Sequence, residues 1–538
     1  MPQLEVKQNI EAEQLKRSFC GVMMAVAKQI PPTVTLSVIS QVIAAIPHLE
    51  EAAIHLTPWL VDKDLIGSAT GIARFYEGQS AFGDAKRWYL QCRDISNQQL
   101  GTNHPDTATS LNNLAELYRT MGRYSDAEPL YVQSLHIQEQ QLGADHPGTA
   151  TSLNNLAELY RTMGRYSDAE PLYVQSLEIR EQRLGADHPG TATSLNNLAE
   201  LYRTMGRYSD AEPLYIRSLE IREQRLGADH PDTATSLNNL AALHYSMGCY
   251  SDAEPMLVRS LEIDKKVYGD DHLAVAKSLN NLAGLYDSQG RYDEADLLYQ
   301  EALELYRRIL GEEHPSIAVI LNNLAGLYYS QGRYNEAEPL YLQAMTMSQC
   351  LLGEDHPTAI LSLNNLAALY RIQNRYLEAE ELYLKVLEKR RLLFGEAHPD
   401  TATSLNNLAA LYEAQGRYAE AESLYLQSLQ LRQELLGENH PSIATSFNNL
   451  GSLYYSQKRF GESEALLLKS LELQKRLLGN NHPDILTTLN NLAELYRAQG
   501  RNFEAESLFA EALNLSRQFL GEEHPISAKL RHNLEAVQ

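Results

Sequence analysis

The sequence repeats itself every 42 residues, and this period constrains the fold more than any other feature. A fixed period of about 20–50 residues is typical of a solenoid, in which each unit buries its apolar face on the next one. We therefore expect one continuous core rather than the several domains that 538 residues would otherwise suggest. The period is marked by a histidine that proline follows everywhere except at Leu273, and these histidines are His104, His146, His188, His230, His272, His314, His356, His398, His440, His482 and His524.

The repeat divides the chain into units of unequal quality. Ten clear units fill residues 104–523, and a truncated half-unit fills 524–538. One period earlier, Phe75, Ala85 and Tyr89 stand where the first clear unit has Leu117, Ala127 and Tyr131, so 62–103 is a degenerate unit. We expect the remaining residues, 1–61, to form an N-terminal helical cap, with two or three short helices over 18–61.

Each clear unit is predicted to be a pair of helices. In the first unit, His104 is suited to cap a helix whose first residue is Pro105, because proline is tolerated where no backbone N–H is needed. Apolar residues then recur at three- and four-residue spacing until Gly122, and a second such stripe runs from Tyr124 to Gly143. Neither helix can bury its stripe alone, so the units must stack.

These residues resemble the tetratricopeptide repeat. On the first helix that repeat has a large residue, then Leu, then Gly or Ala, then Tyr, and these positions hold Leu111, Leu114, Ala115 and Tyr118 here. It continues with Gly, Tyr, Ala and an aromatic residue, and these positions hold Gly122, Tyr124, Ala127 and Tyr131. The unit is 42 residues long instead of the usual 34, which lengthens each helix by roughly one turn. The longer form with its His-Pro and Asn-Asn-Leu-Ala strings looks like the repeats of kinesin light chains and their bacterial relatives. The resemblance implies an all-α, right-handed superhelix of about eleven helix-turn-helix units.

The resemblance also implies a function. Such repeats form non-catalytic scaffolds that bind extended peptides of partner or cargo proteins in the concave groove, with cargo adaptor for a microtubule motor as one role. The partners would be proteins, among them kinesin-type motors or their cargo, in the cytoplasm or on the cytoskeleton. The heptad coiled coil that docks the motor in kinesin light chains is not found ahead of the repeats. An alternative is a sensor arm like those of bacterial nucleotide-binding switch proteins, and residues 18–61 would then be a remnant joint to an upstream ATPase.

Composition narrows the classes of partner. With 46 basic and 69 acidic residues the net charge is −23, which disfavours nucleic acid and anionic membrane surfaces. The four cysteines are far apart, so neither a disulfide framework nor a zinc site is predicted. No secretory signal, spanning segment, phosphate-binding loop, dinucleotide-binding glycine motif, zinc-protease motif or nucleophile elbow is present, so we expect no enzyme and no cofactor.

The phased histidines are predicted to be structural. Successive copies are separated by two layers of helices about 10 Å deep, whereas zinc ligands lie within roughly 2.3 Å of one ion. A shared metal site is therefore excluded for this column.

A pair of asparagines recurs in the same phase and marks the predicted peptide site. The second asparagine points away from the buried side of the first helix, and its amide can both donate to and accept from a peptide backbone. Family members that clamp peptides use this slot, whose members here are Asn113, Asn155, Asn197, Asn239, Asn281, Asn323, Asn365, Asn407, Asn449 and Asn491. The alternative is that one or both asparagine columns only bond neighbouring helices.

Variable slots near the asparagines are candidates for side-chain selection. Arg119, Arg161 and Arg203 share one such slot in the early units, beside glutamates at a second slot, whereas the middle units have small residues and tyrosine. The alternative is a solvated face with Glu–Arg pairs, each worth a few tenths of a kcal/mol. Three positions break their columns, namely His244, Cys249 and Leu273, and we interpret them as drift.

Overall fold

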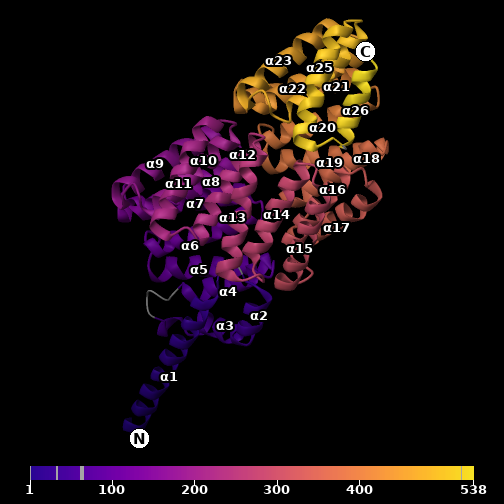
Figure 1. Cartoon of the computed structure of the whole chain (residues 1–538). Coiled ribbons are helices and arrows are strands. Elements are labelled where there is room, and N and C mark those ends of the chain that lie inside the picture. Colours follow the sequence, from indigo (N-terminus) through magenta and orange to yellow (C-terminus); the bar gives the residue numbers. More distant parts are fainter. Residues whose placement is uncertain (1, 32–33, 61–65, 523, 538) are drawn as a thin grey trace.

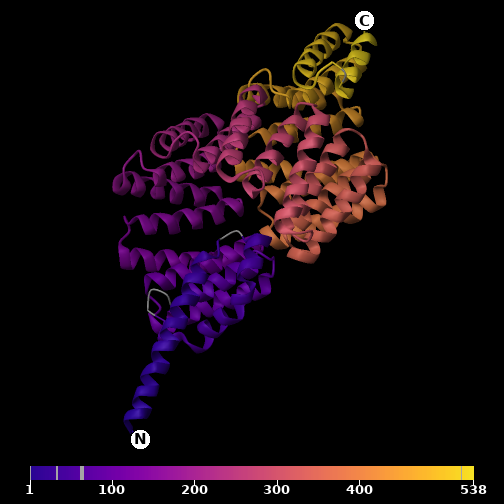
Figure 2. The ribbon, with the colours of Figure 1, turned by 60° about the horizontal axis from the view of Figure 1, so that its bottom comes forward.

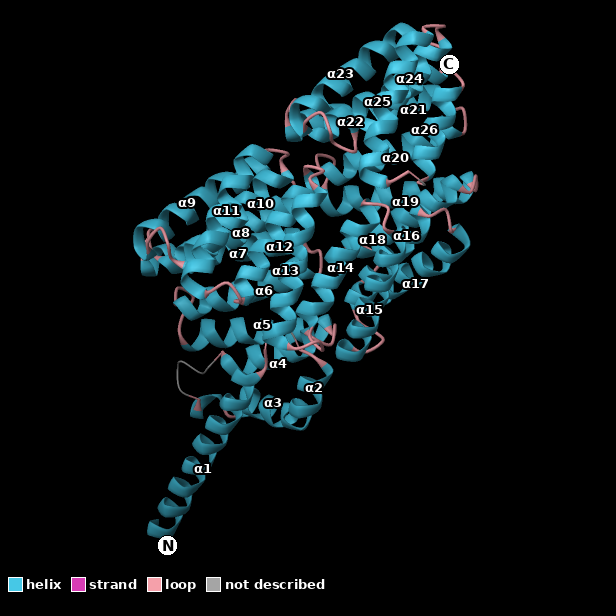
Figure 3. Ribbon diagram, viewed as in Figure 1, coloured by secondary structure: helices cyan, strands magenta, loops and turns pink. Residues whose placement is uncertain are grey.

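The computed structural model describes the chain except residues 1, 32–33, 61–65, 523 and 538. The described part contains helices and loops but no strand (Figure 3). The helices stack in sequence order from the N-terminus at one end of the molecule to the C-terminus at the other (Figure 1). The predicted all-α tetratricopeptide solenoid is therefore confirmed.

The ten clear units each contain a first and a second helix. The first helices are α6 (Pro105–Thr120), α8 (Pro147–Thr162), α10 (Pro189–Thr204), α12 (Pro231–Ser246), α14 (Leu273–Ser288), α16 (Pro315–Ser330), α18 (Pro357–Ile372), α20 (Pro399–Ala414), α22 (Pro441–Ser456) and α24 (Ile485–Ala498). The second helices are α7 (Tyr124–Leu142), α9 (Tyr166–Leu184), α11 (Tyr208–Leu226), α13 (Tyr250–Tyr268), α15 (Tyr292–Leu310), α17 (Tyr334–Leu352), α19 (Tyr376–Phe394), α21 (Tyr418–Leu436), α23 (Phe460–Leu478) and α25 (Asn502–Leu520). The chain ends with α26 (Pro525–Glu535).

The N-terminal region consists of α1 (Pro2–Gln29), α2 (Leu36–Val42) and α3 (Ile46–His55), with short 3₁₀ helices at Ile43–Ala45 and Thr57–Trp59, followed by the pair α4 (Gly67–Glu77) and α5 (Phe82–Gln99). The expectation of only short helices over 18–61 is wrong at its start, because α1 is a single 28-residue helix that projects from the body (Figure 1). Strong helix formers before residue 18 extend the helix backwards, and Gly21 does not interrupt it. The boundaries expected at 61/62 and 523/524 involve residues outside the described part.

The unit boundaries follow from local chemistry. Nδ1 of His104 accepts a hydrogen bond from the backbone N–H of Asp106 at 3.1 Å, which caps α6 as predicted. The same helix ends before Gly122, whose φ of +71° is left-handed backbone that glycine adopts without strain. The second helix then begins at Tyr124, as expected from the sequence.

The core is continuous from unit to unit because small and large side chains alternate. Ala115 and Ala127 have no exposed surface, and Leu114 and Leu117 are equally buried. Tyr131 is 1% exposed and packs in the same layer. Small alanines allow the two helices of a unit and their neighbours to approach closely, which is how the stacked pairs reach a close-packed interior.

Successive turns of the superhelix also contact each other, which the repeat pattern did not predict. Nε2 of His356 lies 2.8 Å from the carbonyl oxygen of Thr120, 236 residues earlier in the chain. The next three histidines make the equivalent contact with Thr162, Thr204 and Ser246. In two views the early and late units lie side by side (Figures 1 and 2). Since Nδ1 of each ring accepts the capping N–H, Nε2 carries the proton and donates it to the carbonyl.

Candidate peptide-binding groove

The inner faces of α6, α8 and α10 form what we call the early groove. They line a cavity of about 460 Å³ together with Asn239 of the next unit. Its other lining residues are Asn112, Asn113, Glu116, Arg119, Asn154, Asn155, Glu158, Arg161, Asn196, Asn197 and Glu200. Both asparagine columns and the predicted arginine and glutamate slots therefore lie on one surface.

The asparagines form a ladder between units, which we call the Asn ladder. Nδ2 of Asn155 donates to Oδ1 of Asn112 in the preceding unit at 2.9 Å. The same bond recurs at 2.8–3.3 Å for Asn197, Asn239, Asn281, Asn323, Asn365, Asn407, Asn449 and Asn491. Both columns thus connect neighbouring first helices, in agreement with the alternative that the sequence left open.

The ladder leaves part of each amide unused. One N–H of the second asparagine bonds the preceding unit, and in four units its oxygen accepts a long bond of 3.3–3.5 Å from the adjacent asparagine. A carboxamide offers two N–H donors and two acceptor lone pairs, so one donor and at least one acceptor site remain. All ten members of this column are half-buried, whereas Asn196, Asn322, Asn364 and Asn448 of the preceding column are buried.

In the early groove the charged side chains neutralise one another. Arg119 donates to Glu116 through Nε at 3.0 Å, and Tyr131 on the second helix donates to the same carboxylate at 2.6 Å. The arrangement repeats with Arg161, Glu158 and Tyr173 and with Arg203, Glu200 and Tyr215. Arg161 also reaches Thr204 of the next unit at 3.5 Å.

Hydrogen bonding keeps two of these carboxylates, Glu116 and Glu200, charged despite their partial burial. Burial alone would raise the pKa of Glu116, but the hydrogen bonds from Arg119 and Tyr131 outweigh it and hold that pKa below the usual range. The same balance lowers the pKa of Glu200. Sequence reasoning missed the tyrosines on the second helices. The sequence contains little signal for this pairing, because Ala242 and Leu257 replace the glutamate and the tyrosine together, but Tyr299 remains where Gly284 has replaced the glutamate.

The inner faces of α12, α14 and α16 form a chemically different surface, which we call the middle groove. They line a cavity of about 480 Å³, whose walls include Ala242, Gly284, Tyr245, Tyr268 and Tyr299 beside the asparagines. Alanine and glycine at the glutamate slot open the wall, and Tyr245 replaces arginine and bonds Ser288 of the next unit at 2.7 Å. This cavity is less polar than the one in the early groove.

Asp287 is an unneutralised acid beside the middle groove, where it acts electrostatically on Tyr299, a residue that lines the cavity. It lies one turn beyond Gly284 on α14, and within the described residues no ion pair includes it. Burial raises the pKa of this carboxyl to about 6. Sequence reasoning identified the slot but not this environment, because burial depends on how neighbouring units stack.

Comparisons with known proteins identify the family of the repeat. The tetratricopeptide repeat model matches residues 65–140, 111–182, 163–224, 190–266, 232–308, 289–349, 316–391, 358–434, 400–476, 442–502 and 484–538. No curated protein matches the chain. In the described residues no helix is long and apolar enough to cross a membrane.

Solved structures with similar helices include proteins of kinesin light chain type. BtubC (BKLC) from P. vanneervenii is 24% identical over 44% of this chain and 92% of that one, with a TM-score of 0.35. A putative kinesin light chain from Podosopora anserina is 27% identical over 38% of this chain and 97% of its own, with a TM-score of 0.33. Yeast Tom70 is 14% identical over 89% of this chain and 96% of its own, with a TM-score of 0.42. Because the repeat model matches successive units from residue 65 to residue 538, the chain belongs to the tetratricopeptide repeat family.

Proposed function

We propose that this chain is a non-catalytic scaffold that binds extended segments of partner proteins along the Asn ladder. The observation that carries the proposal is the shared cavity of the early groove, in which asparagines of consecutive units present unused amide groups in register. A peptide backbone needs a donor and an acceptor at regular intervals, which such amides supply at any sequence. Many weak contacts then add up to retention.

Selection of the partner sequence would come from the walls. The early groove offers paired charges, the middle groove offers open space and tyrosine hydroxyls, and the carboxylate of Asp287 lies beside the middle groove. A segment with a basic side chain would place that cation at Asp287, since an opposite charge stabilises the ionised carboxylate. The partner is therefore expected to carry lysine or arginine where it passes Asp287, beside the middle groove.

The proposal is tested by screening the full chain against an array of synthetic peptides of about 15 residues. We expect a subset of extended, lysine- or arginine-containing peptides to be retained. Ala242→Arg combined with Gly284→Arg fills the middle cavity with two cations, and this variant should no longer retain these peptides. Retention of no peptide, or equal retention by this variant, would contradict the proposal.

As a finer role we propose a kinesin light chain-like adaptor in the cytoplasm, associated with the cytoskeleton when a motor is bound. The support is the His-Pro and Asn-Asn-Leu-Ala repeat pattern shared with that group. Its test is binding of the full chain to a purified kinesin-type heavy chain. Absence of binding while peptides are still retained would remove the adaptor role and leave the general scaffold.

The alternative, a sensor arm of a nucleotide-binding switch protein, has one supporting observation. Contacts between successive turns, such as His398 to Thr162, would break if a ligand changed the curvature of the superhelix. Small-angle scattering with and without a retained peptide tests it. A change in the radius of gyration would favour the sensor arm, and an unchanged radius would favour a static scaffold.

A further inference from the structure

Nine of the ten clear units contain the same cationic cluster at the turn between their two helices. The arginine that directly precedes the second helix lies over the ring of a tyrosine on the first helix, at 3.6–4.6 Å from its centroid. In a typical unit Arg207 also pairs with Asp210 at 2.7 Å and with Glu170 of the preceding unit at 2.9 Å. One cation thus neutralises two carboxylates and stacks on a π face.

The unit over 230–271 has lost this cation but kept the acids. Histidine stands at the tyrosine slot as His244, and cysteine stands at the arginine slot as Cys249. Asp252 and Glu212 still occupy the two acidic slots, and both carboxylates act electrostatically on the Cys249 thiol. Among the described residues no ion pair includes either acid, so two negative groups face a site from which the guanidinium has been removed.

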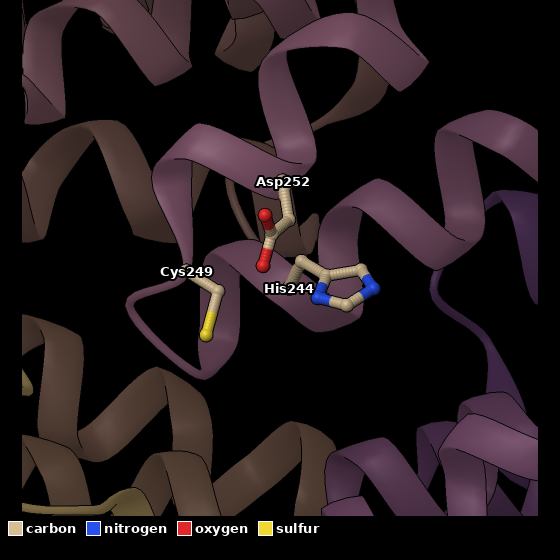
Figure 4. A group of neighbouring side chains, drawn as sticks. All are labelled: His244, Cys249 and Asp252. Carbon is tan, nitrogen blue, oxygen red and sulfur yellow. The ribbon is translucent and has the colours of Figure 1, made fainter.

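The replaced side chains lie together. His244 comes from the last turn of α12, Cys249 from the turn, and Asp252 from the first turn of α13 (Figure 4). One ligand atom from each lies within 4.8 Å of the others, and no second such group is found in the described residues. Nδ1 of His244 is buried without a hydrogen-bond partner among the described residues. A buried imidazole nitrogen is normally bonded, so this one points to a ligand.

The three ligand types agree on one class of cation. Imidazole nitrogen, thiolate and carboxylate are the usual ligands of Zn²⁺, with bonds of about 2.0–2.3 Å. Tetrahedral geometry at these lengths separates ligand atoms by roughly 3.3–3.8 Å, which small rotations from the present separations reach. The partial exposure of the cluster leaves the fourth position to water or to a partner's side chain.

We propose that His244, Cys249 and Asp252 bind a divalent transition-metal ion of the zinc type, which supplies the positive charge that arginine supplies in the other units. The two column breaks interpreted from sequence as drift are then one paired replacement. The ion would fix the turn between α12 and α13 at the edge of the middle groove. The end of α12 beside this loop also contacts the next turn of the superhelix, because Nε2 of His482 lies 3.4 Å from the carbonyl of Ser246.

The test uses the full chain, stripped of metal with a chelator and titrated with Co²⁺ as a spectroscopic probe. We expect one equivalent to bind with thiolate-to-cobalt charge-transfer absorption and tetrahedral d–d bands, and Zn²⁺ to displace it. Cys249→Ser should abolish the charge-transfer band, and Asp252→Asn should weaken the affinity by about tenfold or more. Cys350→Ser, an exposed cysteine outside the cluster, is the matched control and should change nothing.

A second variant keeps the proposal falsifiable if single changes disturb folding. His244→Tyr with Cys249→Arg restores the residues that nine other units carry, so it should fold and bind no Co²⁺ at this site. Zn²⁺ should raise the melting temperature of the natural chain but not that of this variant. Equal cobalt spectra for the two proteins, or no binding by the natural chain at micromolar concentrations, would overturn the proposal.

Discussion

The early and middle grooves share one ladder and differ in their walls. In both, asparagines of consecutive first helices bond each other at 2.8–3.3 Å. In the early groove Glu–Arg pairs and tyrosines fill the space above the ladder, whereas alanine and glycine leave it open in the middle groove. The comparison teaches that the ladder asparagines, which both grooves share, set the spacing of the units. Substitutions at single wall positions of the repeat change the chemistry of the surface.

The largest effect is expected when one of the Glu–Arg pairs of the early groove is removed. Glu158→Ala leaves the buried hydroxyl of Tyr173 without its acceptor and removes one of the two carboxylates that pair with Arg161. We expect the free energy of unfolding to fall by about 2–3 kcal/mol, the cost of unsatisfied buried polar groups. Urea unfolding followed by circular dichroism measures it.

The matched control for Glu158→Ala copies the middle groove. Glu158→Ala with Arg161→Tyr and Tyr173→Leu installs the residues found at Ala242, Tyr245 and Leu257. This triple variant should recover most of the lost stability. If the triple variant remains as unstable as the single variant, the wall residues of one groove cannot be replaced by those of the other.

The second prediction concerns pH and separates the two grooves. Because burial raises the pKa of Asp287 to about 6, this group is mostly ionised at pH 7.5 and mostly protonated at pH 5. A peptide that places a cation there should bind about tenfold more weakly at pH 5, since only about a tenth of the carboxyl is then ionised. Isothermal titration calorimetry at the two pH values measures the ratio.

Two controls sharpen the pH prediction. Asp287→Asn should bind the peptide weakly and equally at both pH values. A peptide whose basic residue is replaced by norleucine should show the same flat profile with the natural chain. A tenfold pH effect that survives in Asp287→Asn would place the titrating group elsewhere.

The smallest effect concerns the turns of the early groove, which later units contact. His398→Asn keeps a helix cap but removes the contact from Nε2 to the carbonyl of Thr162 at 3.2 Å. We expect a loss of about 1 kcal/mol in unfolding free energy. His188→Asn is the matched control, because His188 occupies the same slot and is exposed, and it should cost close to nothing.

His398 also predicts that folding stability falls as the pH is lowered. Burial lowers the pKa of His398, so the folded state favours the neutral ring. Its contribution to stability is complete above the pH at which an unfolded histidine titrates, about 6.5, and falls progressively below it. Hydrogen exchange at Thr162 and its neighbours should speed up as the pH falls from 7 to 5, after correction for intrinsic rates. Unchanged protection would contradict the role of the contact.

Much of the fold was predictable because its signals are local. The His-Pro caps, the turn glycines and the two apolar stripes each act within one unit, so the helix bounds follow from the sequence, as at Tyr124 and Gly143. The contact between His356 and Thr120 was not predictable, since it depends on the pitch summed over nearly six units. The length of α1 was missed because charged helix formers before residue 18 carry no apolar stripe.

The candidate site was predictable in its residues but not in their bonds. Periodicity places Asn155 on the inner face, yet only the stacking of units shows that it donates to Asn112. In the same way, the sequence shows that His244 and Cys249 depart from their columns, and the turn geometry brings them beside Asp252. Contacts between units depend on rotation and rise per unit, which the residues within one unit do not specify.

The most direct test of the Asn ladder compares two triple variants for binding of one retained peptide. Asn155, Asn197 and Asn239→Ala removes the groove-facing amides, and Asn112, Asn154 and Asn196→Ala breaks the same three bonds from the other side. Both should lose similar stability, so folding is matched. The account predicts a loss of peptide affinity of about a hundredfold or more for the first triple, roughly 1 kcal/mol for each amide contact, and less than about threefold for the second. Equal affinities for the two triples would show that the ladder only joins the units and holds no peptide.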